Sequence, residues 1–116
     1  VESMLRGNAR AYVDPAKPPG CMIVLSGLLG TAENQAVRRF LADMRKSGED
    51  SLRRRLERAV VEGDLAPDAD TGRMAAYFTT LLHGLSIQAR DGASQADLDA
   101  IVDCAMTAWD ILAGPR

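Results

Sequence analysis

The sequence has 116 residues, 47% of them hydrophobic and 4% aromatic, and its formal net charge at pH 7 is −2. This length fits one domain with its own core, and the scarcity of aromatic residues favours helix over sheet. The small net charge excludes a bulk electrostatic argument for binding nucleic acid or an acidic membrane surface.

The two cysteines, Cys21 and Cys104, match no metal-ligand or redox spacing. We expect reduced thiols in a cytoplasmic protein, with a disulfide between them as the alternative. No signal peptide is recognisable, and the longest charge-free runs are too polar to span a membrane. The sequence begins with Val1 rather than methionine, which indicates a fragment or a missing beginning.

The chain opens with a modest helical pattern from Val1 to Tyr12, which Asp14-Pro15 and then Pro18-Pro19-Gly20 bring to an end. An apolar run follows from Cys21 to Leu29. Its β-branched residues would allow a buried strand, but no second strand candidate exists to pair with it. We therefore expect a short buried helix here.

A long helix is predicted from about Ala32 to Glu62, with Thr31 as its cap and a slack point around Ser47-Gly48. Gly63 and then Pro67 end it. The expected apolar stripe of this helix consists of Val37, Phe40, Leu41, Met44, Leu52, Leu56, Ala59 and Val60.

The stretch from Met74 to Ala89 contains no formally charged residue. Asp70 can cap this helix, and Asp91-Gly92 can end it. One arc is apolar, and the reverse side is small or weakly polar instead of charged, so we expect both sides to be covered. In so short a chain, a second copy is the natural cover for one side. This pattern predicts an oligomerising helical domain.

The last helix is predicted from Gln95 to about Ala113, opened by a capping box of Ser94 with Asp97 in the place of the usual glutamate. Leu98 and Val102 belong to its apolar side. Its opposite side is expected to be a solvated stripe of Asp99, Asp103 and Asp110. The predicted fold class is all-α, a helical bundle.

Arginines crowd the long helix, which raises the alternative of a nucleic-acid surface. Acidic residues are interleaved with them, and no aromatic residue is placed to stack on bases. We therefore interpret the cluster as a solvated helix face with three ion pairs at i,i+4 spacing: Glu49–Arg53, Asp50–Arg54 and Arg58–Glu62.

Three further patterns suggest chemistry but lack its other requirements. Asp68-Ala69-Asp70 lacks the glutamate that closes a calcium loop, and Gly27–Gly30 lacks the lysine of a phosphate-binding loop. His83, the single histidine, has no nucleophile that a motif assigns to it. It is either a satisfied polar residue in a helix pair or a ligand-contacting or pH-sensitive group. We expect no enzyme activity, no metal and no cofactor.

The order of these elements resembles a known family. The features are the PPGC turn with its apolar helix, the long helix ending in Glu62-Gly63-Asp64-Leu65, the charge-free helix after Asp70, the Gly92-Ala93-Ser94 break and the last helix through Trp109. Together with the phrases EGDL and ARDGAS, they resemble the C-terminal ligand-binding and dimerisation domain of TetR/AcrR-family transcriptional regulators, from about Met4 to Leu112.

The resemblance implies that residues 1–116 form one regulatory domain, in which a small apolar or amphipathic ligand alters DNA binding by N-terminal heads. It also implies that the last two helices form a four-helix bundle with those of a second copy. The helix-turn-helix domain of that family has no counterpart in this sequence, so operator DNA is expected as a partner only through a missing domain. The alternative is a stand-alone helical dimerisation or protein-interaction module without DNA binding.

An apolar pocket between the earlier helices is also implied. Methionines suit a pocket that must adapt to varied ligands, although core packing alone explains the same stripe. The expected ligand-binding residues are Met4, Asn8, Met22, Leu25, Phe40, Met44, Tyr77 and Leu81.

The homodimer is predicted from the residues themselves, because small side chains at four-residue spacing let two helices approach closely. His83 lies about 180° round the helix from Met74, so we expect it at the dimer contact and away from the pocket. The expected interface residues are Ala76, Thr80, His83, Gly84, Ile87, Ala100, Cys104 and Ile111.

Overall fold

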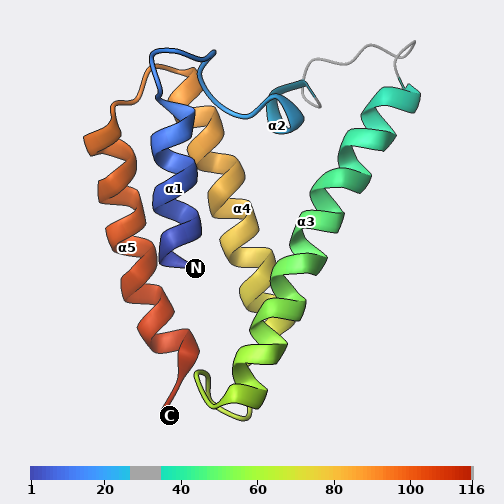
Figure 1. The fold of residues 1–116 in the computed structure, drawn as a ribbon, viewed down its shortest axis with the longest axis vertical. Helices are drawn as coiled ribbons and strands as arrows, with labels where there is room; N and C mark the ends of the chain where they lie inside the picture. Colours follow the sequence, from blue (N-terminus) through green and yellow to red (C-terminus); the bar gives the residue numbers. More distant parts are fainter. Residues whose placement is uncertain (27–34, 116) are drawn as a thin grey trace.

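The computed structural model describes residues 1–26 and 35–115, and within these ranges the chain forms five helices and no strand. The helices are α1 (Glu2–Tyr12), α2 (Met22–Ser26), α3 (Gln35–Glu62), α4 (Thr71–Arg90) and α5 (Gln95–Ala113). Figure 1 shows α1, α4 and α5 side by side, with α3 inclined away from them toward its own N-terminal end and α2 between that end and α4. The all-α prediction is confirmed.

The core lies where α1, α4 and α5 meet. Phe78 of α4 is fully buried, and its ring centroid lies 5.7 Å from that of Trp109 of α5. Small residues at the contacts, such as Ala9 of α1 and Ala105 of α5, let the helices approach closely and are themselves buried. The larger buried side chains around them are Leu5, Met74, Leu85, Leu98 and Val102.

The ends of α4 and α5 lie where the sequence places them. Asp70 caps α4 by accepting a hydrogen bond from the backbone N–H of Arg73 at 3.0 Å. Gly92 ends the turn after α4 with φ at 103°, a left-handed conformation that glycine adopts without strain. Ser94 and Asp97 form the predicted capping box, each side chain accepting from the other's backbone N–H.

The predicted stripe of α3 is only half buried. Leu56 and Ala59 pack into the core, whereas Val37 and Phe40 are 55% and 62% exposed. Only part of the predicted apolar stripe of α3 therefore contributes to the core. The reason is geometric, because a straight helix that leaves the body at an angle carries its first turns beyond reach of the core (Figure 1). The predicted cap Thr31 and residues 27–34 lie outside the described residues.

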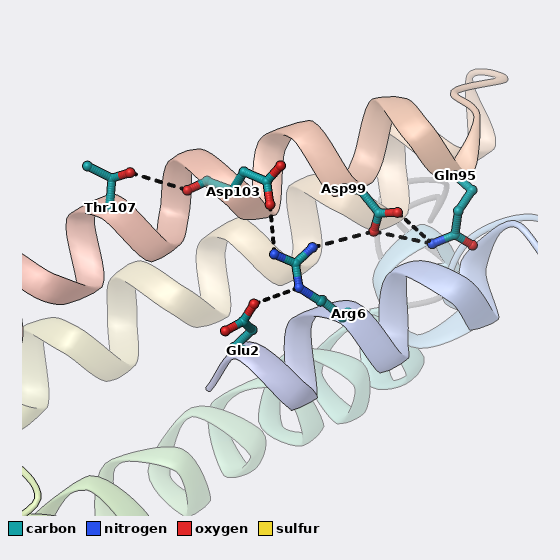
Figure 2. Close-up of polar contacts among 6 residues, drawn as sticks. All are labelled: Glu2, Arg6, Gln95, Asp99, Asp103 and Thr107. Atoms are coloured by element: carbon teal, nitrogen blue, oxygen red, sulfur yellow. Dashed lines mark hydrogen bonds and ion pairs between the residues drawn. The ribbon is translucent and has the colours of Figure 1, made fainter.

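An ion-pair network joins α1 to α5 (Figure 2). Arg6 donates to Glu2 and to Asp103, both at 2.7 Å, and lies 3.8 Å from Asp99. Asp99 also accepts from the side-chain amide of Gln95 at 3.3 Å. The predicted stripe is exposed at Asp103 and Asp110, as expected, and α1 adds an arginine that lies close to Asp99 and Asp103 at its edge.

The C-terminal end of α3 is tied to the rest of the molecule. Gly63 reverses the chain with φ at 85°, and the backbone N–H of Ala66 then donates to the carbonyl of Ala113 at 2.9 Å. Just beyond α5, a Cβ at Gly114 would lie 2.9 Å from the Cβ of Ala66. The loop from α3 to α4 and the end of α5 therefore pack backbone against backbone.

Candidate ligand-binding cavity

A cavity of about 310 Å³ lies where the first four helices meet. Its wall is mostly apolar, and it forms because α3 diverges from α4 just where α2 begins to bridge them. A Cβ at Gly48 of α3 would meet no atom within 4 Å, so the wall is open at this glycine. The lining residues are Met4, Asn8, Tyr12, Cys21, Ile23, Val24, Met44, Arg45, Gly48, Leu52, Thr79, Leu82 and His83.

Two hydrogen bonds hold the start of α2 over this cavity. Ser86 of α4 is fully buried, and its hydroxyl accepts from the backbone N–H of Cys21 at 2.6 Å. Arg45 of α3 donates from Nη1 to the carbonyl of Ile23 at 2.9 Å. The chain reaches this position because the backbone N–H of Gly20 donates to the carbonyl of Tyr12, folding the proline turn back over α1. Helices α3 and α4 therefore both contact α2 through polar groups.

Two titratable side chains in the wall are held in their neutral forms. Burial, and next the nearby Cys21, raise the pKa of Tyr12 to about 12, so its hydroxyl stays protonated. Burial lowers the pKa of His83, the nearby Arg45 lowers it further, and Glu49 opposes them. Among the described residues, neither the Tyr12 hydroxyl nor the His83 imidazole has a hydrogen-bond partner. Both can serve a ligand.

Three of the predicted pocket residues line the cavity, and others do not. Met4, Asn8 and Met44 line the cavity, whereas Met22 and Phe40 are exposed on the outside of the molecule. For Leu25 the described structure gives the helical backbone alone. The roles of the three lining residues in ligand binding stay predictions.

On α4 the expected rotation of the helix is wrong. His83 lines the cavity, while Tyr77 lies on the other side, in a groove with α5. Leu81 is half-buried against the core. The buried arc is centred on Phe78, Leu85 and Ala89, because α1 and α5 both pack there, and this centre turns Tyr77 outward and His83 toward α3.

Sequence reasoning missed Thr79 and Leu82 as cavity residues. The usable signal was the run Thr79, His83 and Ser86, which places three polar groups on one side of a charge-free helix at i, i+4 and i+7. Arg45 was missed because it stands within a row of surface arginines, and its contact with the carbonyl of Ile23 depends on where α2 lies.

A second concave surface lies on the outer face of α4 and α5. It is an apolar groove of about 390 Å³ lined by Arg73, Tyr77, Ala108, Ile111 and Leu112. Ile111 is 77% exposed, and Tyr77 and Ile87 are also exposed. Five of the other predicted interface residues lie on this outer side of the two helices, at least partly exposed: Ala76, Thr80, Gly84, Ala100 and Cys104.

Within the described ranges, no group of three or more histidine, cysteine, aspartate or glutamate side chains is placed to hold a metal ion. None of the helices that the structure describes combines the length and apolar character that crossing a membrane requires.

The fold is an all-helical domain with a mostly apolar cavity, and comparisons identify its family. Residues 3–103 match the family model described as "Tetracyclin repressor-like, C-terminal domain". Two solved structures of cysteine variants of the TetR family transcriptional regulator CifR, each complexed with 26-base-pair double-strand operator DNA, are similar over 93% of this chain. Their sequence identities are 37% and 36%, with TM-scores of 0.90 and 0.89.

The chain therefore belongs to the TetR family of transcriptional regulators and corresponds to their C-terminal domain. It spans 56% of the length of the two CifR chains. Among curated proteins no match was found.

Proposed function

We propose that this domain binds a small, largely apolar effector in the cavity between α1, α2, α3 and α4, and that binding alters how N-terminal heads of a TetR-like repressor hold operator DNA. The observation that carries the proposal is the cavity itself, about 310 Å³ in volume and lined mainly by apolar side chains. Ligand sites have this character: concave, apolar and supplied with a few polar groups.

The mechanism is a coupled two-state equilibrium. Met44 and Arg45 of α3 share the cavity wall with Leu82 and His83 of α4. A ligand that contacts both helices prefers one angle between them over another, and this difference in affinity shifts the equilibrium. Because the coupling is reciprocal, operator DNA bound by the same regulator changes ligand affinity by the same factor.

A thermal-shift screen of small apolar compounds tests the proposal. A ligand present at about 100 times its Kd stabilises the folded state by about 2.7 kcal/mol. In the variant Leu82→Trp the larger side chain fills the cavity and should abolish the shift. Val61→Trp, on an exposed side of α3 that lines neither the cavity nor the groove of α4 and α5, is the control and should retain it. If every binder shifts both variants equally, the ligand site lies elsewhere.

We further propose that the outer face of α4 and α5 forms a homodimer. The exposed residues Ile87 and Ile111 would otherwise leave an apolar patch in water, and a two-fold contact covers the same surface on both copies. A stable interface of this kind buries at least about 1,200 Å² in total.

The variant Gly84→Arg tests the dimer. In the single chain a Cβ at Gly84 meets no atom within 4 Å, so the monomer has room for a side chain to begin at this position. Sedimentation at micromolar concentration should give a dimer for the parent and a monomer for the variant. A monomeric parent, or a variant that stays dimeric, contradicts this interface.

A further inference from the structure

Arg45 is the one formally charged side chain among the described residues that line the cavity. The rest of that lining is apolar or neutral, and no carboxylate belongs to it. Arg45 itself is half-buried, at the boundary between the cavity and the surface. The described part of the wall therefore offers a ligand a positive charge and no negative one.

The charge of Arg45 has no carboxylate partner within 4.0 Å among the described residues. Glu49 stands one turn further along α3, but its carboxylate pairs with Lys46 at 3.3 Å. Arg45 instead donates one N–H to the carbonyl of Ile23 at 2.9 Å. A guanidinium carries five N–H donors, so contacts within the described part of the chain use only a small share of its hydrogen-bonding capacity.

A basic groove of about 450 Å³ continues from the cavity along the N-terminal half of α3. Arg38, Arg39 and Arg45 line it, and Arg45 belongs to both the groove and the cavity. The opposite half of the helix differs, because Arg53 pairs with Glu57 at 3.8 Å and Arg58 with Glu62 at 2.7 Å. Positive charge is thus concentrated at the approach to the cavity, where it attracts anions.

We propose that the effector is an amphipathic monoanion, a carboxylate on an apolar chain of medium length, whose carboxylate Arg45 binds while the chain lies among Met4, Met44, Leu52 and Leu82. The inference rests on the proposed function and specifies the chemical class of its ligand. An arginine–carboxylate contact is charge-assisted and often bidentate. An ammonium group in the same place would face the guanidinium, and the described lining residues include no carboxylate to compensate.

The cavity volume sets the size of the molecule. At about 30 Å³ for each water-sized group, 310 Å³ holds about ten non-hydrogen atoms. Octanoate has that size. The neutral imidazole of His83 and the hydroxyl of Tyr12 can each donate a further hydrogen bond to ligand oxygen, because each has a polar hydrogen and lines the same cavity.

Three probes with the same eight-carbon chain test the proposal: octanoate, 1-octanol and octylamine. Each is titrated against the parent by calorimetry and thermal shift. We expect octanoate to bind more tightly than octanol, and octylamine not to bind. In Arg45→Gln the affinity for octanoate should fall about tenfold or more, because a hydrogen-bonded ion pair is lost, while the affinity for octanol stays unchanged. Arg45→Lys should retain part of the preference for octanoate.

Arg53→Gln is the matched control, since it removes an arginine from the same helix outside the cavity, and it should leave all three affinities unchanged. Equal affinity of the parent for octanoate and octanol overturns the proposal, as does an Arg45→Gln variant that loses both alike. If all three probes fail while another compound shifts the parent and not Leu82→Trp, the ligand class is wrong and the proposed function stands. If no compound gives a thermal shift that Leu82→Trp abolishes, the proposed function fails as well.

Discussion

Removing the Ser86 hydroxyl should break the hydrogen bond that holds the residue before α2 against α4. Ser86 is 0% exposed, and its Oγ accepts the backbone N–H of Cys21 at 2.6 Å. In Ser86→Ala that N–H loses its partner, and the methyl group that remains cannot replace it. An orphaned buried donor costs about 1–3 kcal/mol. Because Cys21 is only half-buried, water can partly solvate its free N–H. We therefore expect Ser86→Ala to lower the free energy of unfolding by about 1–2 kcal/mol.

For a domain of this size, about 1 kcal/mol corresponds to about 4 °C in the unfolding midpoint. Ser86→Ala should therefore lower the midpoint by about 4–8 °C in a calorimetric scan. The control is Ser3→Ala, on the exposed side of α1, which should change the midpoint little because alanine is the better helix former. Both scans need the same protein concentration, since the proposed dimer would make the midpoint depend on it.

Hydrogen exchange tests the same contact locally. The amide of Cys21 should exchange faster in Ser86→Ala than in the parent, while amides in the middle of α5 keep their relative protection. A midpoint equal to that of Ser3→Ala, with unchanged exchange at Cys21, would refute the view that this hydrogen bond anchors α2.

Three further outcomes are expected. Ser94→Ala should destabilise the fold by about 1 kcal/mol through loss of the capping box at α5, and urea denaturation that matches Ser3→Ala would contradict this. Burial lowers the pKa of His83, so its contribution to stability is complete above the unfolded-state pKa and is lost as the pH falls below it. His83→Gln should therefore lose less stability than the parent between pH 7.5 and pH 5, and parallel losses would contradict the argument. Gel-shift of this chain against duplex DNA at moderate salt should show no band, whereas micromolar, salt-sensitive binding would indicate phosphate contacts by the arginines of α3.

Local rules were sufficient to predict the helix ends. Asp70 before a charge-free helix, and Ser94 three residues ahead of Asp97, specify caps through contacts within one turn, and both form. Gly63 and Gly92 likewise stand at positive φ, where the sequence predicts the ends of α3 and α4. These features depend on neighbours in the chain, so no knowledge of the tertiary fold is needed.

The cavity could be predicted only in part, because its wall depends on angles between helices. Met4 and Met44 were predicted as pocket residues and line the cavity, but Phe40, from the same stripe of α3 as Met44, does not. What separates Met44 from Phe40 is the point at which α3 leaves the body, and no local pattern encodes that point. The rotation of α4 failed for a similar reason. With nearly every side apolar or small, the sequence of α4 does not say which arc faces α1, and this ambiguity exchanged the positions of Tyr77 and His83.

The ion pairs on α3 could be predicted only in part, because each carboxylate has more than one basic residue within reach. Arg58 and Glu62 pair at 2.7 Å as expected. Glu49 and Asp50 instead lie near Lys46, at 3.3 Å and 3.9 Å, in place of the predicted Arg53 and Arg54. An exposed carboxylate has basic neighbours on both sides along a helix, and the energies differ by only a few tenths of a kcal/mol.

The hydrogen bond between Ala66 and Ala113 holds the C-terminal end of α3 against the end of α5. A change in the angle of α3 therefore pivots about this end. At about 1.5 Å per residue, Gly48 in the cavity wall lies about 21 Å from Glu62, and Gln35 at the far end lies about 40 Å from it. If α3 pivots as a rigid rod, the displacement of Gln35 is about twice that of Gly48. A ligand that widens the cavity by about 1 Å would then move the N-terminal end of α3 by about 2 Å. Arg45 of α3 donates to the carbonyl of Ile23 in α2, so the same movement of α3 would strain this hydrogen bond.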